Sequence, residues 1–82
     1  MAEFIGRLKS GEEIRVEIAC PGRYRLVIGS GERQVFDEYQ KARKEGEIRM
    51  LESFFPEARR SEIKYLLASP MDEWEQLILK FR

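Results

Sequence analysis

The spacing of the apolar residues changes near residue 30, and this change constrains the fold more than any other feature of the chain. Before it, apolar and polar residues alternate, which is typical of strands that bury one face. After it, apolar residues recur at every third or fourth position, which is typical of helices that bury one side. Strands followed by helices predict an α+β fold in which helices cover one face of an antiparallel sheet. At 82 residues the chain is expected to form a single small domain, residues 1–82.

The first part of the chain predicts a meander of three antiparallel strands, at residues 3–9, 12–19 and 24–29. The first loop must have an odd length, because a slip of one residue would turn the apolar residues of one strand outward. A three-residue loop that ends at Gly11 pairs Phe4 with Val16. It also puts Gly11 at the left-handed position that such a turn requires. Together with Leu26, these two apolar residues are expected to share the buried face.

The second part predicts three to four short helices, at residues 32–45, 47–55, 57–68 and 70–81. Residues 32–36 fit either the start of the first helix or a short fourth strand. Gly46 is expected to end the first helix, and Ser69 is expected to cap the start of the last one. A three-stranded sheet with one apolar face is not stable alone, so the helices are expected to pack on that face.

The residue types that are missing exclude several kinds of active site. The chain has no histidine and one cysteine, Cys20, so neither a nucleophilic triad nor a zinc site is expected. A dense acidic group at residues 72–75 falls in the expected first turn of a helix, where the macrodipole favours acidic side chains. No metal, no cofactor and no enzyme activity are therefore predicted.

Charge and composition also bear on location. The 15 basic and 15 acidic residues cancel, so the chain as a whole does not attract nucleic acid or membranes. No apolar run approaches the roughly 18 residues that span a bilayer, and the first residues lack the apolar centre of a signal peptide. With a single cysteine, a cytoplasmic location is expected. The chain is rich in Glu and Arg and has no Asn or Thr. This composition resembles that of proteins from hot environments, but a biased genome would also explain it.

The face of the meander opposite the apolar one is predicted to be rich in arginine. On the expected register this face carries the apolar residues Ile5 and Val27 and the acid Glu17. Its cations are Arg7, Lys9, Arg15, Arg23 and Arg25. Such side chains are an ordinary solvated covering of a one-sided sheet, but arginine also suits the bidentate capture of carboxylates and phosphates.

These cations lead to two hypotheses about function. The first is a small non-catalytic protein-binding module, such as an adaptor, a complex subunit or an inhibitor, which contacts an acidic partner through them. The alternative is a nucleic-acid-binding protein that uses the same basic face on phosphates. Phe4 and Tyr24 are expected on the buried face, which disfavours a stacking platform for single strands.

A secondary interface is predicted on the last helix, where apolar residues extend beyond the expected buried stripe. Its residues are Trp74, Leu79 and Phe81. Exposed apolar patches commonly mark sites of association. The open edges of the meander would also allow a partner strand to add, or a homo-oligomer to form.

Overall fold

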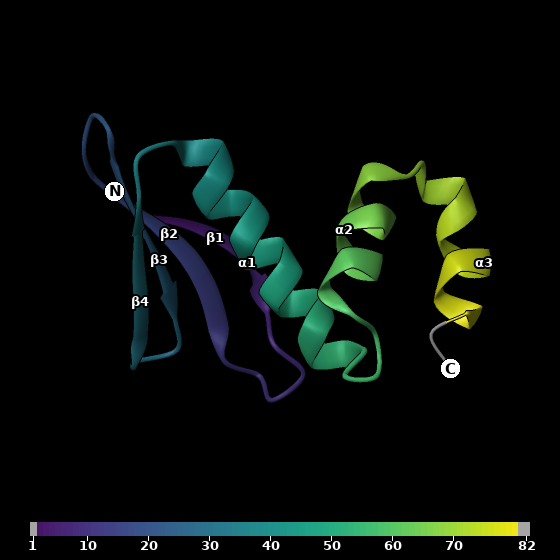
Figure 1. Ribbon diagram of the computed structural model, residues 1–82. Helices are drawn as coiled ribbons and strands as arrows, with labels where there is room; N and C mark the ends of the chain where they lie inside the picture. The colour runs from purple at the N-terminus through teal and green to yellow at the C-terminus, as the bar shows by residue number, and fades with distance from the viewer. Residues whose placement is uncertain (1, 81–82) are drawn as a thin grey trace.

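The computed structural model describes residues 2–80 and has the α+β architecture that the sequence predicts (Figure 1). Four strands form one antiparallel sheet in the order β1 (Ala2–Arg7), β2 (Glu13–Cys20), β3 (Arg23–Ile28) and β4 (Glu32–Phe36). The helices are α1 (Tyr39–Phe54), α2 (Arg60–Ala68) and α3 (Trp74–Leu79), the last preceded by a 3-10 turn at Met71–Glu73. The three expected strands are present, with ends shifted by at most two residues.

Residues 32–36 form a strand, so the expected helix at 32–45 is wrong in its first part. Gly29, at a φ of 60°, begins a tight turn that brings the chain back alongside β3. From the Ile28–Glu32 pair to the Tyr24–Phe36 pair, β4 then pairs with β3 without a break. This pairing satisfies backbone groups of β3 that would otherwise lie at an open edge.

Gly46 lies inside α1, so the expected division into helices at 32–45 and 47–55 is also wrong. A Cβ atom at Gly46 would lie 3.1 Å from Cδ1 of Leu26 and 3.2 Å from Cγ2 of Ile14. The missing side chain of Gly46 therefore lets α1 pack closely against Leu26 and Ile14 of the sheet. This packing stabilises the helix on both sides of the glycine, so the helix does not end there.

The register of β1 differs from the expected one because the strand contains a bulge between Phe4 and Gly6. The first loop is as predicted, with Gly11 at a φ of 98°. The bulge, however, pairs Phe4 with Arg15 instead of Val16 and turns Ile5 toward the core. The expectation that Phe4 is buried and Ile5 faces outward is therefore wrong. Val16 and Leu26 are buried on the same face, as predicted, and they also pair with each other.

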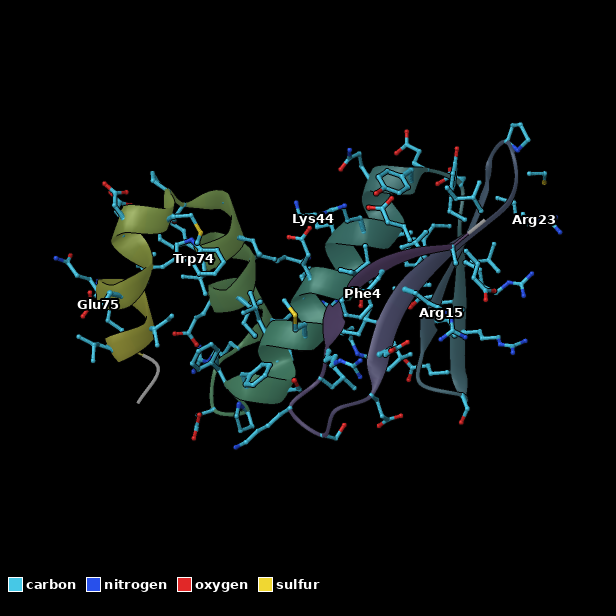
Figure 2. All side chains as sticks on the ribbon, turned by 180° about the vertical axis from the view of Figure 1, so that it is seen from behind. Phe4, Arg15, Arg23, Lys44, Trp74 and Glu75 are labelled. Atoms are coloured by element: carbon cyan, nitrogen blue, oxygen red, sulfur yellow. The ribbon has the colours of Figure 1, made fainter. Side chains whose placement is uncertain are left out.

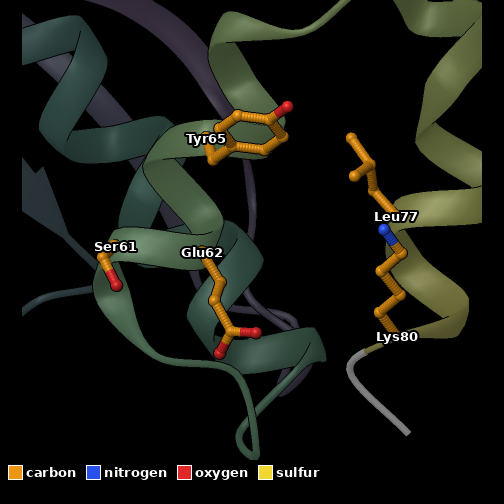
Figure 3. Close-up of a pocket in the computed structure, with 5 residues that line it drawn as sticks. All are labelled: Ser61, Glu62, Tyr65, Leu77 and Lys80. Atoms are coloured by element: carbon orange, nitrogen blue, oxygen red, sulfur yellow. The ribbon is translucent and has the colours of Figure 1, made fainter.

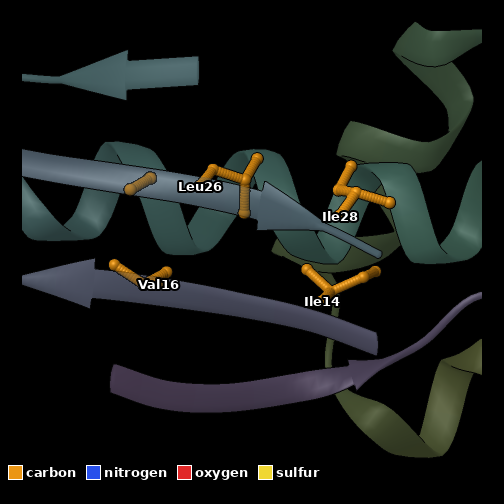
Figure 4. Close-up of a cluster of buried hydrophobic side chains, with 5 residues drawn as sticks. Ile14, Val16, Leu26 and Ile28 are labelled. Atoms are coloured by element: carbon orange, nitrogen blue, oxygen red, sulfur yellow. The ribbon is translucent and has the colours of Figure 1, made fainter. Parts of the chain in front are cut away.

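The buried side chains form two clusters, and α1 contributes to both. The first joins the sheet to α1 and contains Ile14, Val16, Leu26, Ile28 and Ala42 (Figure 4). The second joins α1 to α2 and contains Ile48, Leu51, Ile63 and Leu66. Only α1 lies along the sheet, whereas α2 and α3 extend away from it (Figure 1), which gives the molecule a long axis of 40 Å. The expectation that all helices pack on one sheet face is therefore wrong for α2 and α3.

The corner between α2 and α3 is built differently from the expected cap. The last two helices start later than the predicted 57 and 70, and Ser69 ends α2 rather than capping the start of the next helix. The Ser69 hydroxyl donates a hydrogen bond of 2.7 Å to the carbonyl of Tyr65. The indole N–H of Trp74 donates to the carbonyl of Ser69 at 3.1 Å. These two bonds hold the corner in place of the predicted cap.

Two ion pairs connect α1 to the outer strands of the sheet. Arg43 binds Glu3 of β1 at 2.5 Å, and Arg49 binds Glu32 of β4. The hydrogen-bonded guanidinium of Arg49 lowers the pKa of Glu32, and Glu32 in turn raises the pKa of Arg49. Each edge of the sheet is thereby tied to the helix by one charged contact.

We expect Glu32→Gln to lower the free energy of unfolding at neutral pH by about 0.2–1 kcal/mol, the range of partly exposed pairs. The folded-state pKa of Glu32 is lowered, so this contribution is present above the unfolded-state pKa and disappears as the pH falls through the folded-state pKa. Urea unfolding of both proteins across the acidic range would measure it. Glu57→Gln is the matched control, because Glu57 is exposed and has no ion-pair partner among the described residues. A difference that does not change with pH would contradict the assignment.

Candidate binding surface

The sheet face that α1 leaves uncovered is open to solvent (Figure 2). Strand pairing places alternate residues of all four strands on this surface, which we call the outer face. Its larger side chains are Phe4, Arg7, Glu13, Arg15, Glu17, Arg25, Val27, Arg33 and Val35. Four arginines and two glutamates share the surface, so it is locally basic although the chain is neutral.

The structure brings together some of the predicted cations and separates others. Arg7, Arg15 and Arg25 lie on the outer face as expected. Arg23 lies at the exposed end of the β2–β3 hairpin (Figure 2). Lys9 follows the end of β1 and belongs to the turn before β2, where its backbone N–H donates a 3.0 Å hydrogen bond to Ser53 of α1. The predicted cations do not include Arg33, because the sequence leaves residues 32–36 open between a strand and the start of a helix.

Ion pairs hold most of these arginines in place. Glu17 lies between two of them, 3.6 Å from Arg15 and 3.5 Å from Arg25. Glu13 binds Arg7 at 3.0 Å. Arg33 has no ion pair among residues 2–80. The guanidinium groups are thus partly pre-positioned, which reduces the entropy that a ligand must remove on binding.

The apolar residues of the outer face differ in their exposure to solvent. Val27 is 0% exposed, although no helix covers it. Its neighbours across the sheet are Arg15 and Arg33, whose aliphatic stems can cover it. Val27 therefore lies on the outer face, as predicted, but it is buried there. Phe4 and Val35 are instead 58% and 60% exposed.

Only part of the expected secondary interface lies on the described surface. Trp74 is half-buried and packs with the second cluster, so its ring is a structural element. Leu79 is 66% exposed. Phe81 lies outside the described residues. A hollow of about 330 Å³ lies between α2 and α3, with Tyr65 and Leu77 on its walls (Figure 3).

Three further properties of residues 2–80 concern metal ligands, disulfides and membrane-spanning helices. No group of three or more His, Cys, Asp or Glu side chains is placed to hold a metal ion. Cys20 is exposed and forms no disulfide. None of the helices in this range has the length and apolar character needed to cross a bilayer.

Comparisons with protein-family models, with curated proteins and with solved structures find no match to this chain. The outer face, with its four arginines and two glutamates, is the candidate binding surface among the described residues.

Proposed function

We propose that this chain is a small non-catalytic binding module that contacts an acidic surface of a partner protein through its outer face. The observation that carries the proposal is the placement of four arginines, Arg7, Arg15, Arg25 and Arg33, on a sheet face that no described helix covers. Arginine binds carboxylates through two parallel hydrogen bonds, and regular strands hold these side chains at set spacings.

The mixture of side chains on the outer face favours a protein as the partner. Protein interfaces combine arginine with exposed aromatic and apolar residues, and Phe4 and Val35 supply such contacts here. Glu13 and Glu17 would repel the continuous negative charge of a phosphate backbone. A protein surface can pair with both signs of charge, so these glutamates are compatible with it.

A second candidate function, nucleic-acid binding through the same basic face, is favoured by one specific observation. Phe4 lies on the outer face, contrary to expectation, and the Arg7 guanidinium is 5.8 Å from the centre of its ring. An aromatic ring beside a cation is the element on which single-strand binders stack bases. Such proteins use several aromatic rings, and Phe4 is the one aromatic residue on the described part of this face, so this function ranks second.

Removing two central charges should separate these functions. We expect Arg15→Gln combined with Arg25→Gln to weaken capture of an acidic partner at least about tenfold, as loss of arginine hot spots does. The measurement is affinity purification from the native host, with and without nuclease, followed by mass spectrometry. Lys9→Gln is the matched control, because Lys9 is an exposed cation outside the paired strands that form the outer face.

The outcomes of this experiment differ between the two candidates. For a protein partner, capture is insensitive to nuclease and lost in the double variant only. For a nucleic acid, capture is abolished by nuclease. The logarithm of the binding constant for a single strand also falls linearly with the logarithm of the salt concentration. A double variant that folds and keeps every partner would overturn both proposals.

A further inference from the structure

The two edges of the sheet differ in how well they can accept another strand. At one edge, the bulge between Phe4 and Gly6 interrupts β1, a feature that protects edges from pairing. At the other edge, β4 pairs with β3 over five consecutive residues without any irregularity. No proline lies in β4. The free side of β4 is therefore a regular template for a further strand.

The direction of the backbone groups of β4 follows from one hydrogen bond. The N–H of Gly29 donates to the carbonyl of Glu13 at 2.8 Å, so the backbone groups of Gly29 face β2. Backbone groups alternate along a strand, so those of residues 24, 26 and 28 face β4. Their partners at 32, 34 and 36 face β3 in return. The N–H and C=O groups of Arg33 and Val35 consequently point to the open edge.

A basic hollow lies beside this edge, on the side of the sheet that α1 covers. Its volume is about 250 Å³, and its lining residues are Phe36, Lys41, Lys44, Glu45, Ile48 and Lys64. Lys41 is held by Asp37 and Glu38, at 3.3 and 3.5 Å, and Glu45 is held by Arg60. Within residues 2–80, Lys44 (labelled in Figure 2) and Lys64 have no ion-pair partner.

We propose that β4 and this hollow bind an extended acidic segment of a partner protein, which adds to the sheet as a fifth strand. Every second side chain of such a segment would lie on the α1 side of the sheet. There an apolar side chain would contact Phe36 and Ile48, and acidic ones would pair with Lys44 and Lys64. The edge of β4 borders the outer face, but the contacts proposed here are made by its backbone and by the hollow on the α1 side, so the inference does not depend on the function proposed above.

A second copy of this chain fits the edge less well. Antiparallel pairing of β4 with its own copy would place both α1 helices on the same side of the joined sheet. The unpaired Lys44 and Lys64 of each copy would then flank the same junction, and like charges repel there. An acidic segment removes this repulsion and supplies the missing partners.

Selection from a random peptide library displayed on phage would test the proposal with the whole chain as target. We expect the enriched peptides to carry acidic and apolar residues at alternate positions. A synthetic copy of the best peptide should bind the double variant Lys44→Glu and Lys64→Glu at least about tenfold more weakly than it binds the unchanged chain. It should also lose binding to Val35→Pro, which removes an outward N–H but no bond to β3.

Matched variants separate this surface from the others. Val35→Ala keeps the N–H and should keep peptide binding. Arg15→Gln combined with Arg25→Gln should also keep it, whatever that variant does to the outer face. Amide shifts of Arg33 and Val35 during titration with the peptide provide a second measurement, which needs no variant to fold.

Three results would overturn the proposal. The first is a selection that enriches no peptide or only peptides without acidic residues. The second is equal binding to Val35→Pro and Val35→Ala, or unchanged amide shifts at Arg33 and Val35. The third is a homodimer in sedimentation experiments that Val35→Pro dissociates, which would assign the edge to a second copy.

Discussion

Replacing Leu66 with alanine is expected to release α2 and α3 while the sheet stays folded. Leu66 is 0% exposed and packs with Ile48, Leu51 and Ile63 in the second cluster. Truncating such a residue costs about 2–5 kcal/mol, because the apolar contacts are lost and a cavity remains. The cluster has four buried residues, so this loss is a large part of what holds the helices. The first cluster contains none of the same residues, so the sheet should be spared.

Native-state amide exchange would measure this separation directly. In Leu66→Ala, the amides of α2 and α3 should exchange rapidly, while those of β2 and β3 keep their protection. Leu79→Ala is the control, because that residue is 66% exposed and should change stability by less than about 0.5 kcal/mol. If the strand amides lost protection together with the helices, the two clusters would form one cooperative unit instead.

Replacing Gly46 with valine is expected to destabilise the whole fold by about 2–3 kcal/mol. Even the first added carbon would lie 3.1 Å from Leu26 and 3.2 Å from Ile14, and valine adds two further methyl groups at this buried position. The sheet and the helix must then move apart along the first cluster. Urea unfolding followed by circular dichroism would measure the loss.

Two further variants distinguish crowding from helix propensity. Lys44→Val, at an exposed position of the same helix, should cost only about 0.5 kcal/mol. Adding Leu26→Val to Gly46→Val removes the nearest crowding atom, so the pair should lose less stability than the two single changes together. Equal losses in Gly46→Val and Lys44→Val would show that crowding is not the cause.

The sequence predicts the central strands well, because both are buried on one face and their apolar residues alternate. It does not decide whether residues 32–36 form the strand β4 or begin a helix. On the α1 side of the sheet that strand carries Glu32 and Gln34, which are polar, so the alternation that marks a buried face is missing. The contact of Glu32 with Arg49 replaces an apolar contact there, and it depends on where α1 lies. Gly46 was misread for a related reason, since a glycine can end a helix or allow a close approach, and only the position of the sheet decides.

The candidate surface could be predicted in outline. Three arginines, Arg7, Arg15 and Arg25, were expected on one face and lie there, because alternation alone determines their side. Arg33 was missed with its strand. The exchange of Phe4 for Ile5 could not be predicted, because two adjacent apolar residues fit either register and the bulge that chooses between them has no local sequence signal.

The sharing of α1 between the two clusters bears on how many molecules this chain can hold at one time. A helix of 16 residues is about 24 Å long, and both α1 and α2 lie between the strands and α3 in a molecule that extends over 40 Å (Figure 1). A macromolecule seated on the strands would leave the far helices accessible to another.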